Sequence, residues 1–323
     1  MAKPKLAIYW AAACGGCDIA ILDIEAKILD VADFFDVVFW PCAMDFKYAD
    51  VEAMEDKSIT LTLFNGAIRS DENFHIAKLL RQKSVVLCAF GSCAADGCIP
   101  ALANLFTLDS ILDYVYLKAP SLDNPGKIIP QLRTKVPEGE ITIPQLWNTV
   151  RTLGQVVDVD YIIPGCPPQS DQIAEVVGAV IDILKNGKPL PPKGTVLGAT
   201  DKSCCDECPR ERNIKKITKF IRPYEIIADP NLCLLEQGIV CLGPATRSGC
   251  GAKCVKASMP CRGCYGKPIN VRDQGAKMIS ALASVIDSTD PGEIDKIIAT
   301  IADPVGTFYR FTLADSFLRR AQV

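Results

Sequence analysis

The chain has 323 residues, and its content of 49% hydrophobic and 23% charged residues is that of an ordinary folded protein with a sizeable core. The formal net charge of −3 creates no strong field that would attract nucleic acid or an anionic membrane, and 7% aromatic residues offer little material for stacking on bases. No apolar run approaches the roughly 18 residues that span a bilayer, so no membrane span is expected.

The first part of the chain alternates strand-like and helix-like patterns. Residues 5–12 form a continuous apolar run before a glycine-containing loop, which is typical of a strand buried on both faces. Ser70 or Asp71 is expected to cap a helix at 70–83. Further strands are expected at 36–41, 58–66, 84–93 and 160–168, and further helices at 19–35 and 170–186. This alternation predicts an α/β fold with a doubly wound parallel sheet.

The rest of the chain has a different character. Residues 100–159 resemble an insertion of loops and short helices, and 186–194 form a proline- and glycine-rich linker. Residues 200–270 hold more than half of the 16 cysteines and few convincing strands, so bound metal is expected to stabilise them. Amphipathic helices are expected again at 273–287 and 291–302. The length and these changes predict two domains, 1–190 and 191–323.

Cysteine usage is the most informative feature of the composition. The N-terminal apolar run is too short for a signal peptide and no twin-arginine leader precedes it, so a cytoplasmic location is expected. Thiols are kept reduced there, which argues against a disulfide scaffold. Because the chain has one histidine, His75, any metal site must be built almost wholly from thiolates, which select zinc or iron–sulfur clusters. His75 itself is expected on the surface or in packing rather than as a ligand.

A first set of cysteines follows three of the expected strands. Cys14 and Cys17 (CGGC) come after the first strand, Cys93 (FGSC) after a middle strand and Cys166 (PGCPP) after a late one. The carboxyl ends of parallel strands meet at one edge of a sheet, so these four thiols should converge. The neighbouring glycines would let backbone N–H groups approach the sulfides of a cluster. A redox CxxC pair or buried structural thiols remain the alternatives.

The C-terminal part contains eight more cysteines in two sets of four. The second set begins in CCDECPRER and the third is spaced C-x3-C-x6-C-x2-C; their members are Cys205, Cys208, Cys233 and Cys241, and Cys250, Cys254, Cys261 and Cys264. Each set could hold one tetrahedral zinc ion or one cubane cluster.

Two features favour clusters over zinc in these sets. Zinc ribbons usually pair two CxxC motifs roughly 15–20 residues apart, and neither set does so. Between Cys233 and Cys264 the only acidic residue is Glu236, whereas the segment contains four basic residues, Arg247, Lys253, Lys256 and Arg262. Nearby cations stabilise an anionic four-thiolate cluster and tune its potential.

Four cysteines remain outside the three sets. Cys42 and Cys88 stand at the ends of apolar runs and are expected to be buried small hydrophobic residues. Cys98 lies five residues after Cys93, and Cys204 is adjacent to Cys205. Either of these last two could serve as an alternate ligand.

These motifs resemble those of the small, electron-transferring subunits of nickel–iron hydrogenases. That family has a flavodoxin-like N-terminal domain and an irregular, helix-containing iron–sulfur domain. The resemblance implies three [4Fe-4S] clusters, with a [3Fe-4S] form possible for the medial one. By this resemblance the proximal cluster is bound by Cys14, Cys17, Cys93 and Cys166; the medial cluster by Cys250, Cys254, Cys261 and Cys264; and the distal cluster by Cys205, Cys208, Cys233 and Cys241. Cys205 stands where many members have histidine, and Cys254 offers a fourth medial ligand.

The all-cysteine ligand sets and the phrases CDECPR and CLLEQGIVCLGPATRSGCGA are similar to the coenzyme-F420-non-reducing, methyl-viologen-reducing group. The resemblance implies a relay that takes electrons from H2 oxidation at the Ni–Fe centre of a partner large subunit. The relay would pass them on through a small iron–sulfur subunit to heterodisulfide reductase. Many relatives carry a glutamate shortly after the CxxC motif, whereas this chain has Asp18 and then Ile19.

Two alternatives stay open at this point. An F420-reducing hydrogenase small subunit is the nearest, although the chain contains no ferredoxin-like C-x2-C-x2-C-x3-C run. A zinc-stapled scaffold protein without a redox role is the alternative from a different class.

Overall fold

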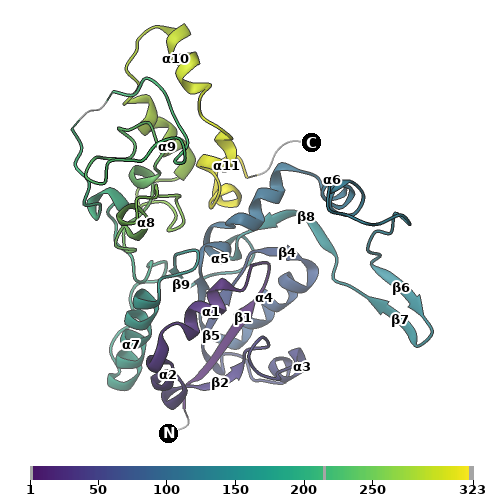
Figure 1. The fold of residues 1–323 in the computed structure, drawn as a ribbon. Helices are drawn as coiled ribbons and strands as arrows, with labels where there is room; N and C mark the ends of the chain where they lie inside the picture. The colour runs from purple at the N-terminus through teal and green to yellow at the C-terminus, as the bar shows by residue number, and fades with distance from the viewer. Residues whose placement is uncertain (1–2, 214–215, 320–323) are drawn as a thin grey trace.

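The computed structural model describes residues 3–213 and 216–319. Its centre is a five-stranded parallel sheet in the order β2-β1-β3-β5-β9 (Figure 1). The strands are β1 (Lys5–Trp10), β2 (Asp36–Phe39), β3 (Ile59–Asn65), β5 (Ser84–Phe90) and β9 (Tyr161–Ile163). This order is the flavodoxin-like variant of the doubly wound sheet, in which the chain runs to one side of β1 and then to the other. The predicted α/β fold class is confirmed.

The sheet is buried on both faces, which explains its continuous apolar strands. Successive residues of a strand point to opposite faces. Leu6 and Ile8 of β1 belong to one buried layer, and Ala7 and Tyr9 belong to the other. Both layers therefore need apolar side chains at each of the four central positions of β1, residues 6–9.

Helices cover the two faces of the sheet. One face packs against α1 (Gly16–Leu22), α2 (Ile28–Phe34) and α7 (Ser170–Asn186). The other face packs against α3 (Tyr48–Glu52) and α4 (Asp71–Lys83). The predicted helices at 70–83 and 170–186 are confirmed, and Ser70 Oγ caps α4 by accepting a 3.1 Å hydrogen bond from the Asn73 N–H.

The single helix expected at 19–35 is wrong, because the chain forms α1 and α2 with a short 3-10 turn between them. Glu25 in that turn has a φ of 57°, a left-handed conformation that an α-helix cannot contain. The apolar spacing is continuous across the turn because both helices face the same layer of the core.

The insertion between β5 and β9 contains more strand than the sequence pattern indicates. It includes α5 (Ser92–Asp96) and α6 (Leu108–Asp113), and β8 (Leu146–Arg151) pairs antiparallel with β4 (Ile68–Ser70). A second antiparallel pair, β6 (Arg133–Val136) and β7 (Gly139–Thr142), forms a hairpin that projects from the body of the molecule (Figure 1). The prediction of loops and short helices alone was therefore incomplete.

In its described residues the C-terminal part is irregular, with four short α-helices, and its core is shared with Ala67, Ala101 and Val150 of the sheet-containing part. The helices are α8 (Lys253–Lys256), α9 (Gln274–Ala283), α10 (Pro291–Ile298) and α11 (Pro304–Phe308). The helices predicted at 273–287 and 291–302 are confirmed with shorter bounds. Leu234, Leu242 and Met278 are among the buried residues of this core.

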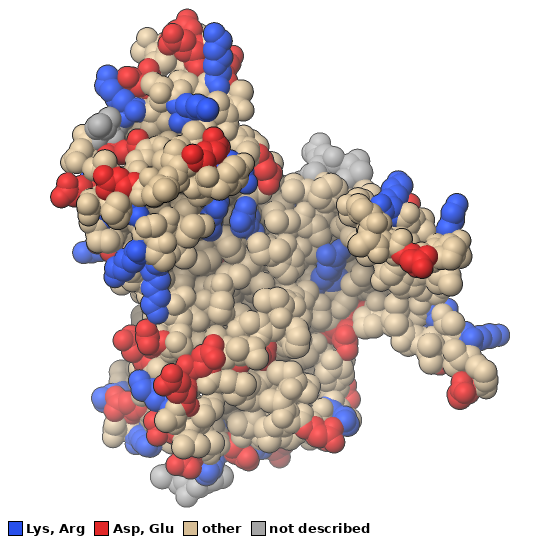
Figure 2. All heavy atoms as spheres, viewed as in Figure 1, with Lys and Arg blue, Asp and Glu red and all other residues tan. Residues whose placement is uncertain are grey.

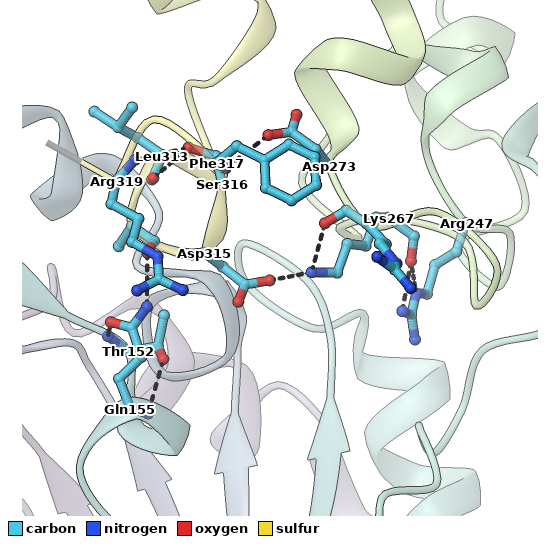
Figure 3. Close-up of polar contacts among 12 residues, drawn as sticks. Thr152, Gln155, Arg247, Lys267, Asp273, Leu313, Asp315, Ser316, Phe317 and Arg319 are labelled. Carbon is cyan, nitrogen blue, oxygen red and sulfur yellow. Dashed lines mark hydrogen bonds and ion pairs between the residues drawn. The ribbon is translucent and has the colours of Figure 1, made fainter.

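Polar contacts join the end of the chain, residues 313–319, to the sheet-containing part and to the irregular core (Figure 3). Gln155 Nε2 donates a 2.7 Å hydrogen bond to the Ala314 carbonyl, and Lys267 forms an ion pair with Asp315. Asp273 accepts a 2.8 Å hydrogen bond from the Phe317 N–H. The end of the chain thus returns to the insertion after building the irregular core.

Across residues 3–213 and 216–319, no single helix has both the length and the apolar character needed to cross a membrane. One pair of helical segments, Ser92–Leu105 and Leu108–Lys118, passes that test only when taken together, and the two are bent by 76°.

Candidate metal centres

The proximal set lies at the carboxyl edge of the sheet, close to the reversal of strand order between β1 and β3. Cys14 and Cys17 follow β1, Cys93 lies in α5 directly after β5, and Cys166 follows β9. Burial raises the pKa of the Cys17 thiol, and the neighbouring thiols of Cys93, Cys166 and Cys14 raise it further. The structure therefore brings these four predicted cysteines together. Cys17 and Cys93 are buried, whereas Cys14 and Cys166 reach the surface.

Glycine makes room for the proximal thiols. Gly91 has a φ of 82°, in the left-handed region, and its N–H donates a 2.8 Å hydrogen bond to the Ile163 carbonyl. A Cβ atom at this position would overlap Cys17 Sγ. The strand–Gly–Cys pattern of the sequence thus corresponds to a backbone that passes directly against the sulfur of Cys17, a predicted ligand.

Asp18 is buried beside the CGGC loop, and both of its carboxylate oxygens accept hydrogen bonds. Its carboxylate accepts hydrogen bonds from Trp40 Nε1 at 2.8 Å, Asn65 Nδ2 at 2.7 Å and Cys42 Sγ at 3.1 Å. These bonds fasten the start of α1 to β3 and to the loop after β2. Cys42, expected to be buried, is exposed, while Cys88 is buried as predicted.

Cys98 is a fifth thiol at the proximal set. It is fully buried, and its Sγ lies 3.6 Å from Cys166 Sγ, to which it donates a hydrogen bond. This hydrogen bond lowers the pKa of Cys166 to about 7. Cys98 is therefore placed to stabilise the thiolate of a neighbouring ligand.

The distal set lines a cavity of about 220 Å³ in the C-terminal part. Cys205, Cys208, Cys233 and Cys241 all line it, together with Cys204, Arg210 and Arg212. A cavity of ~150 Å³ can hold a benzene molecule, so this one has room for a group of several atoms. Gly243 forms part of the wall, and a Cβ atom there would come within 2.9 Å of Cys205 Sγ.

The medial set lies against the other two. Burial raises the pKa of Cys264, and thiols of Cys261, Cys166 and Cys250 raise it further, so Cys264 is near both the medial and the proximal sets. The pKa of Cys254 is also raised by burial and then by Cys261 and Cys250. All four predicted medial cysteines are thus neighbours, and Cys254 is the exposed member.

Cys204 lies between the medial and distal sets. It lines the distal cavity, and its thiol hydrogen-bonds with those of Cys250 and Cys261. The bond from Cys204 lowers the pKa of Cys250 to about 6. Cys98 and Cys204 therefore resemble each other: each is a buried fifth thiol that hydrogen-bonds to members of a predicted set of four. Sequence spacing alone cannot distinguish either of them from a ligand.

Glu207 connects the loop of the distal set to that of the medial set. Its two carboxylate oxygens accept hydrogen bonds from the N–H groups of Gly249 at 2.7 Å and Gly251 at 3.0 Å. These glycines flank Cys250, so a side chain between two distal cysteines fixes the backbone around a medial one.

The donor chemistry fits iron–sulfur clusters. In the described part of the chain, no three Cys, His, Asp or Glu side chains converge closely enough to hold a single metal ion. The three sets present thiols, and glycines leave space at sulfurs of the proximal and distal sets. His75 lies apart on α4, exposed and 3.4 Å from Glu52, as expected for a surface residue.

Comparison with known proteins places the chain in a family. A family model described as NADH ubiquinone oxidoreductase, 20 Kd subunit, matches residues 14–180, which include the whole proximal set, and the chain belongs to this broad family. The NiFeSe hydrogenase of Desulfomicrobium baculatum has a chain of similar fold, with a TM-score of 0.51 and 17% identity over 89% of this chain and 100% of that one.

Two relatives define the chain more narrowly. The iron–sulfur subunit of the F420-non-reducing hydrogenase of Archaeoglobus profundus is 40% identical, and the alignment covers 98% of both chains. The corresponding subunit of the F420-non-reducing hydrogenase of Methanothermobacter marburgensis is 37% identical over 96% of this chain and 94% of that one. This chain is accordingly a member of the family formed by these F420-non-reducing hydrogenase subunits, and it is an iron–sulfur subunit of an oxidoreductase.

Proposed function

We propose that this chain relays electrons from H2 oxidation through three [4Fe-4S] clusters to a downstream iron–sulfur partner. The observation that carries the proposal is the gathering of twelve predicted ligand cysteines into three neighbouring sets of four. Bound at these sets, the clusters would accept and donate single electrons. The polypeptide supplies ligands, buries them and sets the charge around them.

Entry of electrons at the proximal set is supported by its surroundings. Cys14 and Cys166 are exposed there, and so are the apolar side chains of Trp10, Ile19 and Leu22. Figure 2 shows few charged side chains on the face around α5 and the start of α1. An exposed, charge-poor apolar area is typical of a protein interface. We assign it to a hydrogenase large subunit that contains the Ni–Fe centre.

The proposed route then crosses the medial set and leaves from the distal set. Cys264 adjoins the proximal set and Cys204 the distal one, which supports this order. The acceptor we propose is a small iron–sulfur electron-transfer subunit that serves heterodisulfide reductase, with the whole complex in the cytoplasm. No residue of this chain acts as an acid, a base or a nucleophile in the proposal.

The proposed division into domains follows the three sets. We place the proximal cluster in 1–190 and the other two in 191–323. Residues 194–197 run beside β9, where the Leu197 N–H donates a 2.8 Å hydrogen bond to the Ile162 carbonyl. This segment ties the start of the second domain to the edge of the sheet.

The test is the metal content of the chain purified anaerobically with its large subunit. Three [4Fe-4S] clusters require about twelve irons and an equal amount of acid-labile sulfide per chain. If Cys254 is a ligand, Cys254→Ala should convert the medial cluster to a three-iron form and remove about one iron, whereas Cys88→Ala should remove none. Stoichiometric zinc in a colourless protein would contradict the proposal and favour the scaffold alternative. Reduction of F420 by the purified complex with H2 would favour the F420-reducing alternative.

A further inference from the structure

Arg210 is a buried cation without a carboxylate partner. Its side chain is buried, with a relative exposure of 6%. The guanidinium donates hydrogen bonds to neutral acceptors: the carbonyls of Asp229, Leu232 (2.9 Å) and Val255 (3.4 Å), and the hydroxyl of Ser258 (3.2 Å). Among the residues that the structure describes, the ion pairs leave Arg210 out.

An unpaired charge in this position needs compensation. A guanidinium is a permanent cation, so the burial of Arg210 places a positive charge away from water. Carbonyl dipoles replace part of its hydration but supply no net negative charge. Among the described residues no carboxylate pairs directly with the guanidinium, and the cavity that it lines contains one acid, Glu236, beside two arginines, Arg210 and Arg212. A further anion in this cavity would therefore compensate the charge.

The cavity beside Arg210 has the chemistry to contain that anion. Arg210 lines it together with the distal thiols Cys205, Cys208, Cys233 and Cys241. A cubane with four thiolate ligands is a net anion in both of its usual oxidation states. Arg212 also lines the cavity, and its charge lowers the pKa of Cys205, partly offsetting the increase due to burial.

We infer that Arg210 is the fixed counter-charge of the distal cluster and raises its reduction potential. The inference rests on the proposed function and adds a residue whose charge sets the reduction potential of one cluster. Reduction makes the cluster more negative, so a nearby positive charge stabilises the reduced form more than the oxidised form. The same hydrogen bonds join the segment before Cys233 to the one after Cys254, which fixes the position of the charge.

The experiment is a redox titration of the distal cluster, followed by EPR, in the complex of this chain with its large subunit. Arg210→Gln removes the charge and keeps part of the hydrogen bonding. It should lower the equilibrium constant for reduction at least tenfold, which is about 59 mV toward negative potential for one electron. Arg210→Lys keeps the charge and should shift the potential by less than half of that. Iron content is measured for each variant.

Arg247→Gln is the matched control. Arg247 is also an arginine that donates to a backbone carbonyl, that of Lys267, but it lines a different cavity, beside Asp96 and Asp315. Its replacement should leave the distal potential unchanged.

The outcomes separate this inference from the proposed function. A distal signal whose potential is the same in Arg210→Gln as in the unmodified chain overturns the inference and leaves the relay intact. Loss of the distal cluster in Arg210→Gln but not in Arg210→Lys supports the need for the charge. Equal loss in both variants overturns it, because a purely structural role explains that result. Absence of a distal signal in the unmodified chain overturns the proposed function itself.

Discussion

Glycine and arginine shape the thiol sites as much as cysteine does. Gly91 and Gly243 leave space at ligand sulfurs, and Arg210 and Arg212 bring positive charge to the distal cavity. An anionic cluster needs both room for its sulfides and nearby donors or cations. Substitutions beside the cysteines should therefore affect cluster binding almost as strongly as substitutions of the cysteines.

Gly91→Ala provides a direct test at the residue scale. The new Cβ would overlap Cys17 Sγ, and the φ of 82° is strained for alanine. The variant should lose about four irons per chain, the content of the proximal cluster, as measured by iron and sulfide analysis.

Gly178→Ala is the control for this change. Gly178 lies within α7, and a Cβ atom there meets nothing within 4 Å. This variant should keep all its iron and gain up to about 1 kcal/mol of stability from the better helix former. Equal iron in the two variants would refute the role assigned to Gly91.

The sequence reveals ligands more readily than it reveals their surroundings. Cysteine is recognisable because its chemistry depends on the residue type, and the glycine turns place three of the motifs at strand ends. Arg210 and Glu207 are different, because their roles depend on backbone and hydroxyl groups 19 to 48 residues away along the chain. Only the folded arrangement of the loops brings those partners together. The pairing of Cys204 with medial thiols was missed for the same reason.

Among the elements, α5 carries a second buried ionisable group besides Cys93. Asp96 lines a polar cavity of about 330 Å³ together with Arg247, Lys267 and Asp315. Burial and, less strongly, the charge of Asp315 raise the pKa of Asp96, Arg247 and Lys267 oppose the increase, and the resulting pKa is about 7. The folded protein therefore binds a proton at Asp96 more tightly than the unfolded chain, whose aspartate pKa is about 3.9.

This difference predicts a pH-dependent stability. Between about pH 4 and 7 the folded state binds more protons at Asp96, so the free energy of unfolding should fall as pH rises. The contribution is fully present below the unfolded pKa and is lost as pH rises through about 7. Asp96→Asn should remove this slope, which amounts to as much as about 1.4 kcal/mol per pH unit.

Urea unfolding of the variant and the unmodified chain at pH 5.5, 6.5 and 7.5 measures the effect. The free energy of unfolding of Asp96→Asn, relative to that of the unmodified chain, should increase as pH rises. Two curves that stay parallel would show that Asp96 does not titrate in this range.

The pattern of apolar residues predicted best the helices and strands that are buried in the core. The buried strands follow from continuous apolar runs, and the amphipathic α4 and α7 follow from a periodicity of 3.6 residues. By contrast, β6 and β7 have mostly exposed side chains, so their sequence carries no burial pattern to detect. The break between α1 and α2 was missed because apolar spacing records which face is buried and not whether the backbone stays helical.

At the scale of the whole molecule, the hairpin is nearly independent of the rest. β6 and β7 pack mainly on each other, and the Ile143 N–H closes their base with a 3.2 Å hydrogen bond to the Leu132 carbonyl. Ile141 is 55% exposed, which shows how little of the arm is covered by the chain itself.

Replacing residues 132–143 with two glycines should therefore leave the body of the protein intact. Because few contacts with the remaining chain are lost, the melting temperature should change by no more than about 2 °C and the iron content should not change. Differential scanning calorimetry and iron analysis test this. A larger decrease in melting temperature would mean that the arm supports the sheet.

The order of the strands along the chain also determines when, during synthesis, the proximal set becomes complete. Cys14 and Cys17 leave the ribosome early, but Cys166 is synthesised only after β9 at the far side of the sheet. A nascent chain that stops before β9 contains three thiols of the proximal set, Cys14, Cys17 and Cys93, and lacks Cys166. If Cys166 is the fourth ligand, the proximal cluster can be completed only after nearly the whole sheet has been synthesised.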